Sequence, residues 1–267
     1  MSKKKFDLNR HTARLLMNEP FFAAISRCID KVETKALPTA GMQLSDDGVF
    51  TMLYNPDYFS KLSDDEMADV IKHEFYHVIF DHVTGRLPGD TVTMLWNFAT
   101  DLAINSHLRH LPEGALIPGE GDFEELPRYL SAEQYHAELK KRQKEEQKNK
   151  SSEDGEKSSP SLSEIGEFDD HDGWGEANGG NRQLAKERLK GMMSDAAKEA
   201  QQGGGWGSVS EEVKKDILSR IDTKVDWRTV LRYFIKTSQR AHNSSTVKRI
   251  NRRYPYLHPG RKTNRQA

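Results

Sequence analysis

The stretch SDDEMADVIKHEFYHVIF, residues 63–80, decides the fold of this 267-residue chain. Ser63 and Glu66 have the spacing of a capping box, in which each side chain binds the backbone N–H of the other residue, so a helix is predicted to begin here. Farther along, His73 and His77 are four residues apart. On a helix their imidazoles project from the same side, about 40° from each other. The stretch therefore predicts a helix that directs two imidazoles at one point.

The segment from His73 to His77 has the pattern H-E-x-x-H, which is typical of zinc sites. A zinc ion held by two histidines needs a third protein ligand and an open position for water. Glu74 stands beside these histidines, where it can take a proton from that water. Apolar residues surround the motif, as in a buried helix, and buried imidazoles need partners. We expect one catalytic zinc ion (Zn²⁺) with Glu74 as general base; the alternative is two core histidines that hydrogen-bond within the protein.

The third ligand is predicted on a second helix, from about residue 92 to residue 111. Asn97, Asp101 and Asn105 recur every four residues there and form one polar stripe on an otherwise apolar helix. A short turn rich in Gly and Pro separates the two helices, which favours an antiparallel pair. Such a pair aims the carboxylate of Asp101 at the histidines, so Asp101 is the predicted ligand. Asn97 and Asn105 are expected to hold that carboxylate or the N–H groups of the imidazoles.

His82 and Asp81 are alternatives for the third ligand position. The first helix is predicted to run to about Val83, and on it His82 lies about 180° around the axis from His73. Gly85 comes too late to turn the chain before His82, so His82 is expected to point away. Asp81 lies nearer the histidine face and is a weaker alternative ligand, or a partner of a ligand. The donor that stabilises the transition state stays open among four residues: Tyr54, His107, His110 and His136.

The rest of the chain indicates an α+β fold that is mostly helical. Residues 10–32 have helical apolar spacing with a break at Pro20, and Asp46-Asp47-Gly48 lies between two β-prone runs, which predicts a hairpin. From Lys140 a charge run gives way to Ser, Glu, Asp, Gly and Pro, as in disordered segments. The predicted domains are a metal-binding core over residues 1–139, a disordered polar insertion over residues 140–180, and a C-terminal portion over residues 181–267 that packs on the core with helices near 182–201, 210–221 and 226–237.

The composition limits which binding partners and which cellular compartment we expect. Lys and Arg total 40 and Asp and Glu total 41, so net charge indicates no binding to nucleic acid or to an anionic membrane. The single cysteine, Cys28, excludes an internal disulfide and a thiolate metal cluster, which fits a reducing compartment. No signal peptide and no apolar run of about 18 residues is present. We expect a cytoplasmic protein that binds a protein or peptide substrate, with residues 140–180 as the surface for any further protein partner.

Together these residues resemble a known family, the "putative metallopeptidase domain" of bacteria and phages, which often precedes a von Willebrand factor A-like domain. The likeness rests on Tyr54-Asn-Pro56, on His73-Glu-Phe-Tyr-His77 with His82 beyond, on Trp96-Asn-Phe-Ala-Thr-Asp101-Leu-Ala-Ile-Asn105, and on Val225-Asp-Trp227 with Asn251-Arg-Arg253. It implies a zincin-like core, in which a small sheet lies over the H-E-x-x-H helix and its edge strand aligns an extended substrate. It also implies a third ligand from a following helix, in agreement with Asp101, and residues 49–54 near the substrate cleft.

The resemblance implies a zinc metallopeptidase that hydrolyses peptide bonds. The competing hypothesis is a non-catalytic interaction or assembly module, associated with phage or with an AAA+ ATPase, in which the metal only stabilises the fold. An open fourth coordination position would separate the two. We expect no von Willebrand-like domain after Gly260, so partner roles tied to that domain do not follow from the resemblance.

Overall fold

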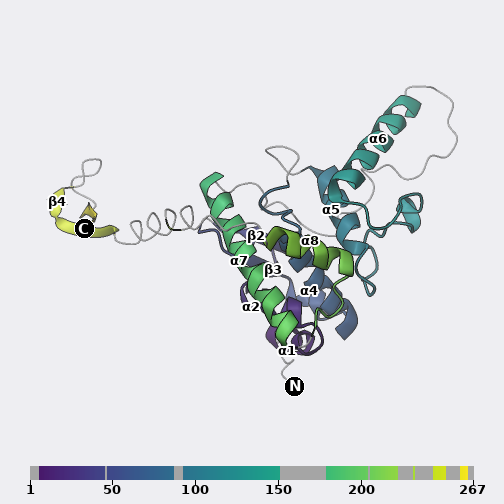
Figure 1. Cartoon of the computed structure of the whole chain (residues 1–267). Coiled ribbons are helices and arrows are strands. Elements are labelled where there is room, and N and C mark those ends of the chain that lie inside the picture. Colours follow the sequence, from purple (N-terminus) through teal and green to yellow (C-terminus); the bar gives the residue numbers. More distant parts are fainter. Residues whose placement is uncertain are drawn as a thin grey trace, which may run out of the picture. The chain divides into compact units, whose positions relative to one another are not determined.

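A computed structural model describes the chain over residues 6–45, 47–86, 93–150, 179–203, 205–221, 231, 243–250 and 259–263 (Figure 1). The helices are α1 (Leu8–Asn18), α2 (Pro20–Arg27), α3 (Pro56–Phe59), α4 (Asp64–Ile79), α5 (Met94–Asn105), the short 3-10 helix η1 (Gly121–Phe123), α6 (Ala132–Lys150), α7 (Gly179–Gly203) and α8 (Glu211–Ile221). The strands are β1 (Asp30–Glu33), β2 (Ala40–Leu44), β3 (Phe50–Tyr54), β4 (Asn243–Ile250) and β5 (Pro259–Thr263). The fold is α+β and mostly helical, as predicted. Two compact units divide the chain, residues 1–224 and residues 225–267.

A three-stranded mixed sheet belongs to the first unit and has the order β1-β3-β2. The predicted hairpin is confirmed, because β2 pairs antiparallel with β3 and Gly48 turns the chain between them with a φ of 69°. β1 pairs parallel with β3 and was not predicted. Its four residues include three charged ones and show no alternating apolar pattern, so only the pairing with β3 makes them a strand.

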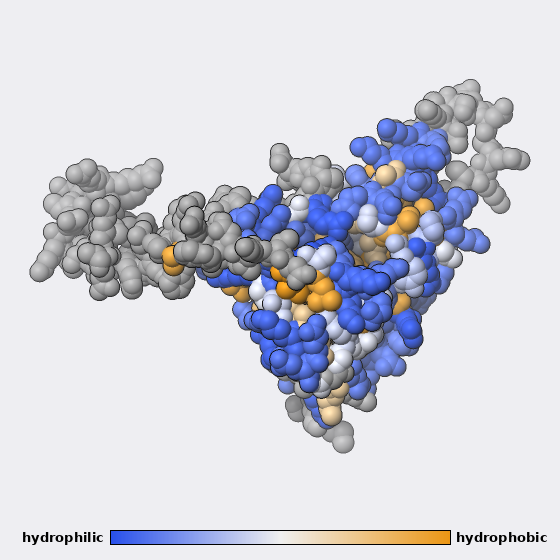
Figure 2. Space-filling model, viewed as in Figure 1, coloured by the Kyte–Doolittle hydropathy of each residue, from blue (hydrophilic) through white to orange (hydrophobic). Residues whose placement is uncertain are grey.

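The helices of the first unit pack around one apolar core. Pro20 separates α1 from α2, as predicted, because proline at the first position of α2 lacks the N–H that a continuous helix needs. α7 contacts α2 and α4, and α4 contacts β2 and α5. The face of this unit seen in Figure 2 is mostly hydrophilic, with small hydrophobic patches. α4 therefore lies in the interior, between the sheet and the other helices.

The structure differs from the predicted organisation in two places. Residues 140–150 continue α6, so this part of the predicted insertion is helical; Lys, Arg, Glu and Gln all favour helix, which explains the difference. Residues 151–178 lie outside the described part of the chain. α7 and α8 match the first two helices predicted after residue 180, and the third, near 226–237, is not described apart from Leu231. β4 and β5 pair antiparallel within the portion predicted to be helical. No helix in the described ranges is long and apolar enough to span a membrane.

Candidate metal centre

The site lies where α4 crosses α5. Three contacts mark the crossing: Asp69 with the backbone of Arg109 and His110, His73 with Asn105, and His77 with Asp101. Along α4 the contacting residues advance by four, from Asp69 to His73 to His77. Their partners go back along the chain by about four, from Arg109 to Asn105 to Asp101. The two helices are therefore antiparallel, as predicted from the short connection between them.

Caps fix where both helices begin. The Ser63 hydroxyl accepts a hydrogen bond from the N–H of Glu66, and the Glu66 carboxylate accepts one from the N–H of Ser63, so the predicted capping box is confirmed. Thr93 caps α5 by accepting from the N–H of Trp96. The two caps thus set the residue at which each helix begins.

Three potential ligand atoms converge at this crossing. Nε2 of His73 lies 2.9 Å from Nε2 of His77, and Oδ1 of Asp101 lies 3.6 Å from the first and 3.4 Å from the second. A tetrahedral zinc ion with bonds of about 2.0 Å holds its ligand atoms about 3.3 Å apart. Two imidazoles and one carboxylate are also a common ligand set of hydrolytic zinc sites. The three residues fit a metal ion in both spacing and chemistry, and all are buried.

Asn105 determines which nitrogen of His73 is available. Its amide N–H donates to the carbonyl of Leu116 (2.8 Å), which orients the side chain, and its Oδ1 then faces Nδ1 of His73 at 2.8 Å. An amide oxygen can only accept, so Nδ1 of His73 carries the hydrogen and Nε2 carries the lone pair. The contact predicted for Asn105 is confirmed. The equivalent role of Asn97 is not seen, because its buried Oδ1 has no hydrogen-bond partner among the described residues.

The end of α4 differs from the prediction. α4 stops at Ile79 instead of near Val83, and Asp81 has a left-handed φ of 62°. The N–H groups of Asp81 and His82 make the two hydrogen bonds of a Schellman motif, the second one to the carbonyl of His77 (2.9 Å). The expectation that His82 points away is therefore wrong. An aspartate that adopts the left-handed conformation, as Asp and Asn do more readily than most residues, was the signal in the sequence.

His82 nevertheless does not reach the side of His77 that faces Asp101. Its Nδ1 lies 3.3 Å from Nδ1 of His77, whereas Asp101 approaches Nε2. His82 is thus a neighbour of a candidate ligand, and Asp101 is the carboxylate that the structure brings to both histidines. Asp81 points elsewhere, with its carboxylate 3.7 Å from Nζ of Lys186 and in contact with Thr84.

Glu74 is buried on α4, next to His73 in sequence and only 1% exposed. Its role as general base stays a prediction. The four candidates for a transition-state donor are dispersed. The ring of His107 packs near Tyr76, Phe80 and Tyr129, that of His136 packs against Trp96, His110 approaches Asp69, and Tyr54 ends β3. Burial lowers the pKa of both His107 and His136 and so favours their neutral form.

Two cavities lie near the site without including its donors. One, of about 670 Å³, lies along the first half of α4 and is lined by Asp69, Lys72 and residues 106–110 among others. The other, of about 300 Å³, is lined by His82 and also by residues of α8. Neither lining contains His73, Glu74, His77 or Asp101. The smaller cavity is thus lined by His82, the residue whose ring contacts that of His77.

Two histidines on one helix and a carboxylate on the next define a candidate metal-binding protein. The chain belongs to the family described as "Putative metallopeptidase domain", whose model matches residues 3–264. A Thermotoga maritima protein described as "Uncharacterized protein" is 25% identical over 260 residues, which cover 90% of this chain and 61% of that protein. The chain thus spans less than two thirds of this relative. No solved structure matches the chain.

Proposed function

We propose that the protein is a zinc metallopeptidase that hydrolyses peptide bonds in a protein or peptide substrate. His73, His77 and Asp101 are the ligands in this proposal and Glu74 is the general base. The observation that carries it is the convergence of the three donor atoms, 2.9 to 3.6 Å apart, on a helix with the H-E-x-x-H pattern. Membership of the metallopeptidase family supports it independently.

The arrangement of the sheet supports a zincin-like core. β2 is an edge strand and contacts α4, as expected of the strand that aligns an extended substrate. β3 is the central strand. We therefore propose that the extended substrate lies along β2, residues 40–44, and not along residues 49–54. The setting is cytoplasmic, which a chain with one free cysteine, Cys28, suits.

The roles of the residues follow from their chemistry. Bound zinc would supply a Lewis acid that lowers the pKa of water and polarises the scissile carbonyl. Glu74 takes the proton of the attacking water and returns it to the leaving amine. Asn105 keeps the lone pair on Nε2 of His73 by accepting from Nδ1. Burial of these side chains keeps bulk water from competing for their hydrogen bonds.

A second function is favoured by one observation. His73 and His77 are 0% exposed and Asp101 is 2% exposed, and neither cavity is lined by them. A metal ion held there without access for a substrate would stabilise the fold only. The second candidate is therefore a non-catalytic interaction module with a structural metal ion, closed by protein ligands.

A hydrolysis assay that compares wild type with one variant distinguishes the two functions. Fluorescein-labelled casein and a mixture of fluorogenic peptides are incubated with zinc-loaded wild type and with Glu74→Gln. A peptidase loses at least about 100-fold in rate on losing its general base, while Glu74→Gln keeps its zinc. Equal cleavage by the two proteins would contradict the mechanism. Zinc binding with no cleavage of any probe by wild type would favour the structural metal.

A further inference from the structure

We propose that His82 is a positioning residue for His77: its Nδ1 accepts the hydrogen bond from Nδ1–H of His77 and so places the lone pair of His77 on Nε2, the atom that would bind metal. This inference rests on the metal centre of the proposed function but not on peptidase activity. The two rings meet nitrogen to nitrogen at 3.3 Å, and His82 is buried. His82 would thus serve His77 as Asn105 serves His73.

The hydrogen atoms explain why such a partner is needed. A neutral imidazole carries one N–H, and an imidazole that binds metal through Nε2 must carry it on Nδ1. Buried N–H groups need an acceptor, and a fixed acceptor also fixes the orientation of the ring. For His77, the ring nitrogen of His82 lies at Nδ1. His82 in turn lies edge-on to Trp96, with 6.2 Å between ring centroids, which restrains its own plane.

The Schellman motif explains how a residue five positions later reaches His77. In this motif the second residue after the helix cap donates its N–H to a carbonyl one turn and a half back, and its side chain often packs on that turn. Here His82 donates to the carbonyl of His77, and Asp81 supplies the left-handed residue between them. The backbone bond therefore brings the two imidazoles together.

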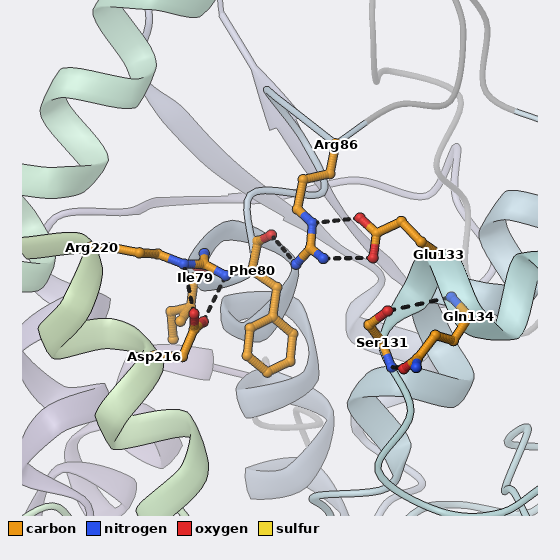
Figure 3. Close-up of polar contacts among 8 residues, drawn as sticks. All are labelled: Ile79, Phe80, Arg86, Ser131, Glu133, Gln134, Asp216 and Arg220. Atoms are coloured by element: carbon orange, nitrogen blue, oxygen red, sulfur yellow. Dashed lines mark hydrogen bonds and ion pairs between the residues drawn. The ribbon is translucent and has the colours of Figure 1, made fainter.

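Two arginines hold this turn, Arg220 from α8 and Arg86 from the chain directly after the turn (Figure 3). Arg220 of α8 donates to the carbonyl of Ile79 (2.9 Å), and Arg86 donates to the carbonyl of Phe80 (3.5 Å). The last carbonyls of a helix lack partners within the helix, so these contacts satisfy the end of α4. Each guanidinium is also paired with a carboxylate, Arg220 with Asp216 and Arg86 with Glu133.

The start of α6 positions Glu133 for this contact. Ser131 and Gln134 cap one another reciprocally, as Figure 3 shows: the N–H of Ser131 donates to Gln134 Oε1 (2.9 Å) and the N–H of Gln134 donates to Ser131 Oγ (3.3 Å). The two carboxylate oxygens of Glu133 then accept from Nε (2.7 Å) and Nη2 (2.6 Å) on one edge of the Arg86 guanidinium. α6 and α8 thus stabilise the turn that carries His82.

The first test measures zinc affinity by competition with a chromophoric chelator. The proteins are wild type, His82→Phe, which fills the space without an acceptor, and His82→Asn, whose amide oxygen can accept near the position of Nδ1. We expect His82→Phe to bind zinc about 10- to 100-fold more weakly, the usual effect of losing such a partner, and His82→Asn to recover most of the loss. Circular dichroism and thermal unfolding check that each variant folds.

The position of the hydrogen on each imidazole ring tests the same claim directly. In long-range proton–nitrogen NMR spectra of the zinc-loaded wild type, Nδ1 of His77 should carry a hydrogen and Nδ1 of His82 should carry none, because His82 accepts there. A hydrogen on Nδ1 of His82 would overturn the proposal. If folded His82→Phe binds zinc as tightly as wild type, the proposal is overturned. If zinc affinity follows the prediction but no probe is hydrolysed, the inference on His82 stands and the peptidase proposal fails.

A matched pair at Asp81 tests whether the turn delivers His82. Both Asp81→Gly and Asp81→Val lose the contacts to Lys186 and Thr84. Glycine adopts a positive φ freely, whereas a β-branched residue there is strained. Asp81→Gly should keep wild-type zinc affinity and Asp81→Val should lose about as much as His82→Phe. Equal affinities for the two variants would overturn the role of the turn.

Discussion

Lys72 and Asp69, one turn apart on α4, form a buried ion pair with 2.5 Å between Nζ and Oδ1. The pair lies directly before His73 and is part of a larger network. Lys72 also approaches Glu19 (3.6 Å) and donates to the hydroxyl of Ser208 (3.3 Å). Because Ser208 in turn donates its N–H to Glu19 (2.7 Å), the network joins the start of α2, the middle of α4 and the loop before α8.

Asp69→Asn should destabilise the fold by about 3 kcal/mol, because it leaves the buried charge of Lys72 without its nearest partner. The matched control is Asp195→Asn, which breaks the i,i+3 pair of Asp195 with Lys198 on the surface of α7. An exposed pair of this kind contributes about 0 to 1 kcal/mol. Urea unfolding at pH 7 gives both values. Equal losses of stability in the two variants would contradict the prediction that burial strengthens the Asp69–Lys72 pair.

Stability should also fall in acid partly through Asp69. Burial alone would raise the pKa of Asp69, but the hydrogen bond and charge of Lys72 and the amides of His110 and Arg109 outweigh it and hold this pKa below its ordinary value. A lowered pKa stabilises the fold above the unfolded value, about 3.9, and that stabilisation is lost as the pH falls through the folded value. Between pH 5 and pH 2, the free energy of unfolding should therefore drop less in Asp69→Asn than in wild type. Parallel pH profiles would argue against this assignment.

Gly207→Ala should destabilise the fold more than Gly205→Ala. Both glycines have a positive φ, 64° and 90°, so alanine is strained at either position by about 1 to 2 kcal/mol. At Gly207, however, a Cβ atom would also lie 2.0 Å from Oε2 of Glu19, while nothing lies within 4 Å at Gly205. The additional loss of stability in Gly207→Ala would come from displacement of Glu19 from the network. Thermal unfolding compares the variants, and equal melting temperatures would contradict the prediction.

Asn105→Ala should weaken zinc binding by about 10- to 100-fold, because Nδ1 of His73 loses the acceptor that fixes its hydrogen. Asn97→Ala is the control on the same helix face, since the Oδ1 of Asn97 has no partner among the described residues. Competition with a chromophoric chelator measures both affinities. A loss as large in Asn97→Ala as in Asn105→Ala would mean that the stripe stabilises α5 and does not orient His73.

The features that could be predicted from sequence are those set by local spacing. The Ser63–Glu66 cap, the turn at Gly48 and the stripe of Asp101 and Asn105 each depend on residues a few positions apart, and the structure contains all of them. Such patterns determine where a helix begins and which face it buries. The crossing of α4 and α5 then follows from a short connection.

The features that could not be predicted depend on distant contacts or on one unusual backbone angle. β1 is a strand because it pairs with β3, some twenty residues later, and its own sequence favours no strand. The end of α4 depends on the left-handed Asp81 and on Arg220, which reaches Ile79 from α8. Apolar periodicity reports neither the backbone angle nor the distant hydrogen bond. A prediction from periodicity alone therefore makes the helix too long and places His82 on the side away from His77.

Metal analysis tests the central claim, a zinc site made by His73, His77 and Asp101, most directly. Wild type, His77→Ala and Asp101→Ala are purified in parallel, checked for folding by circular dichroism and analysed by inductively coupled plasma mass spectrometry. The account predicts about one zinc ion per chain in wild type and no stoichiometric zinc in either folded variant. Wild type without bound metal, or folded Asp101→Ala with its full zinc content, would contradict it.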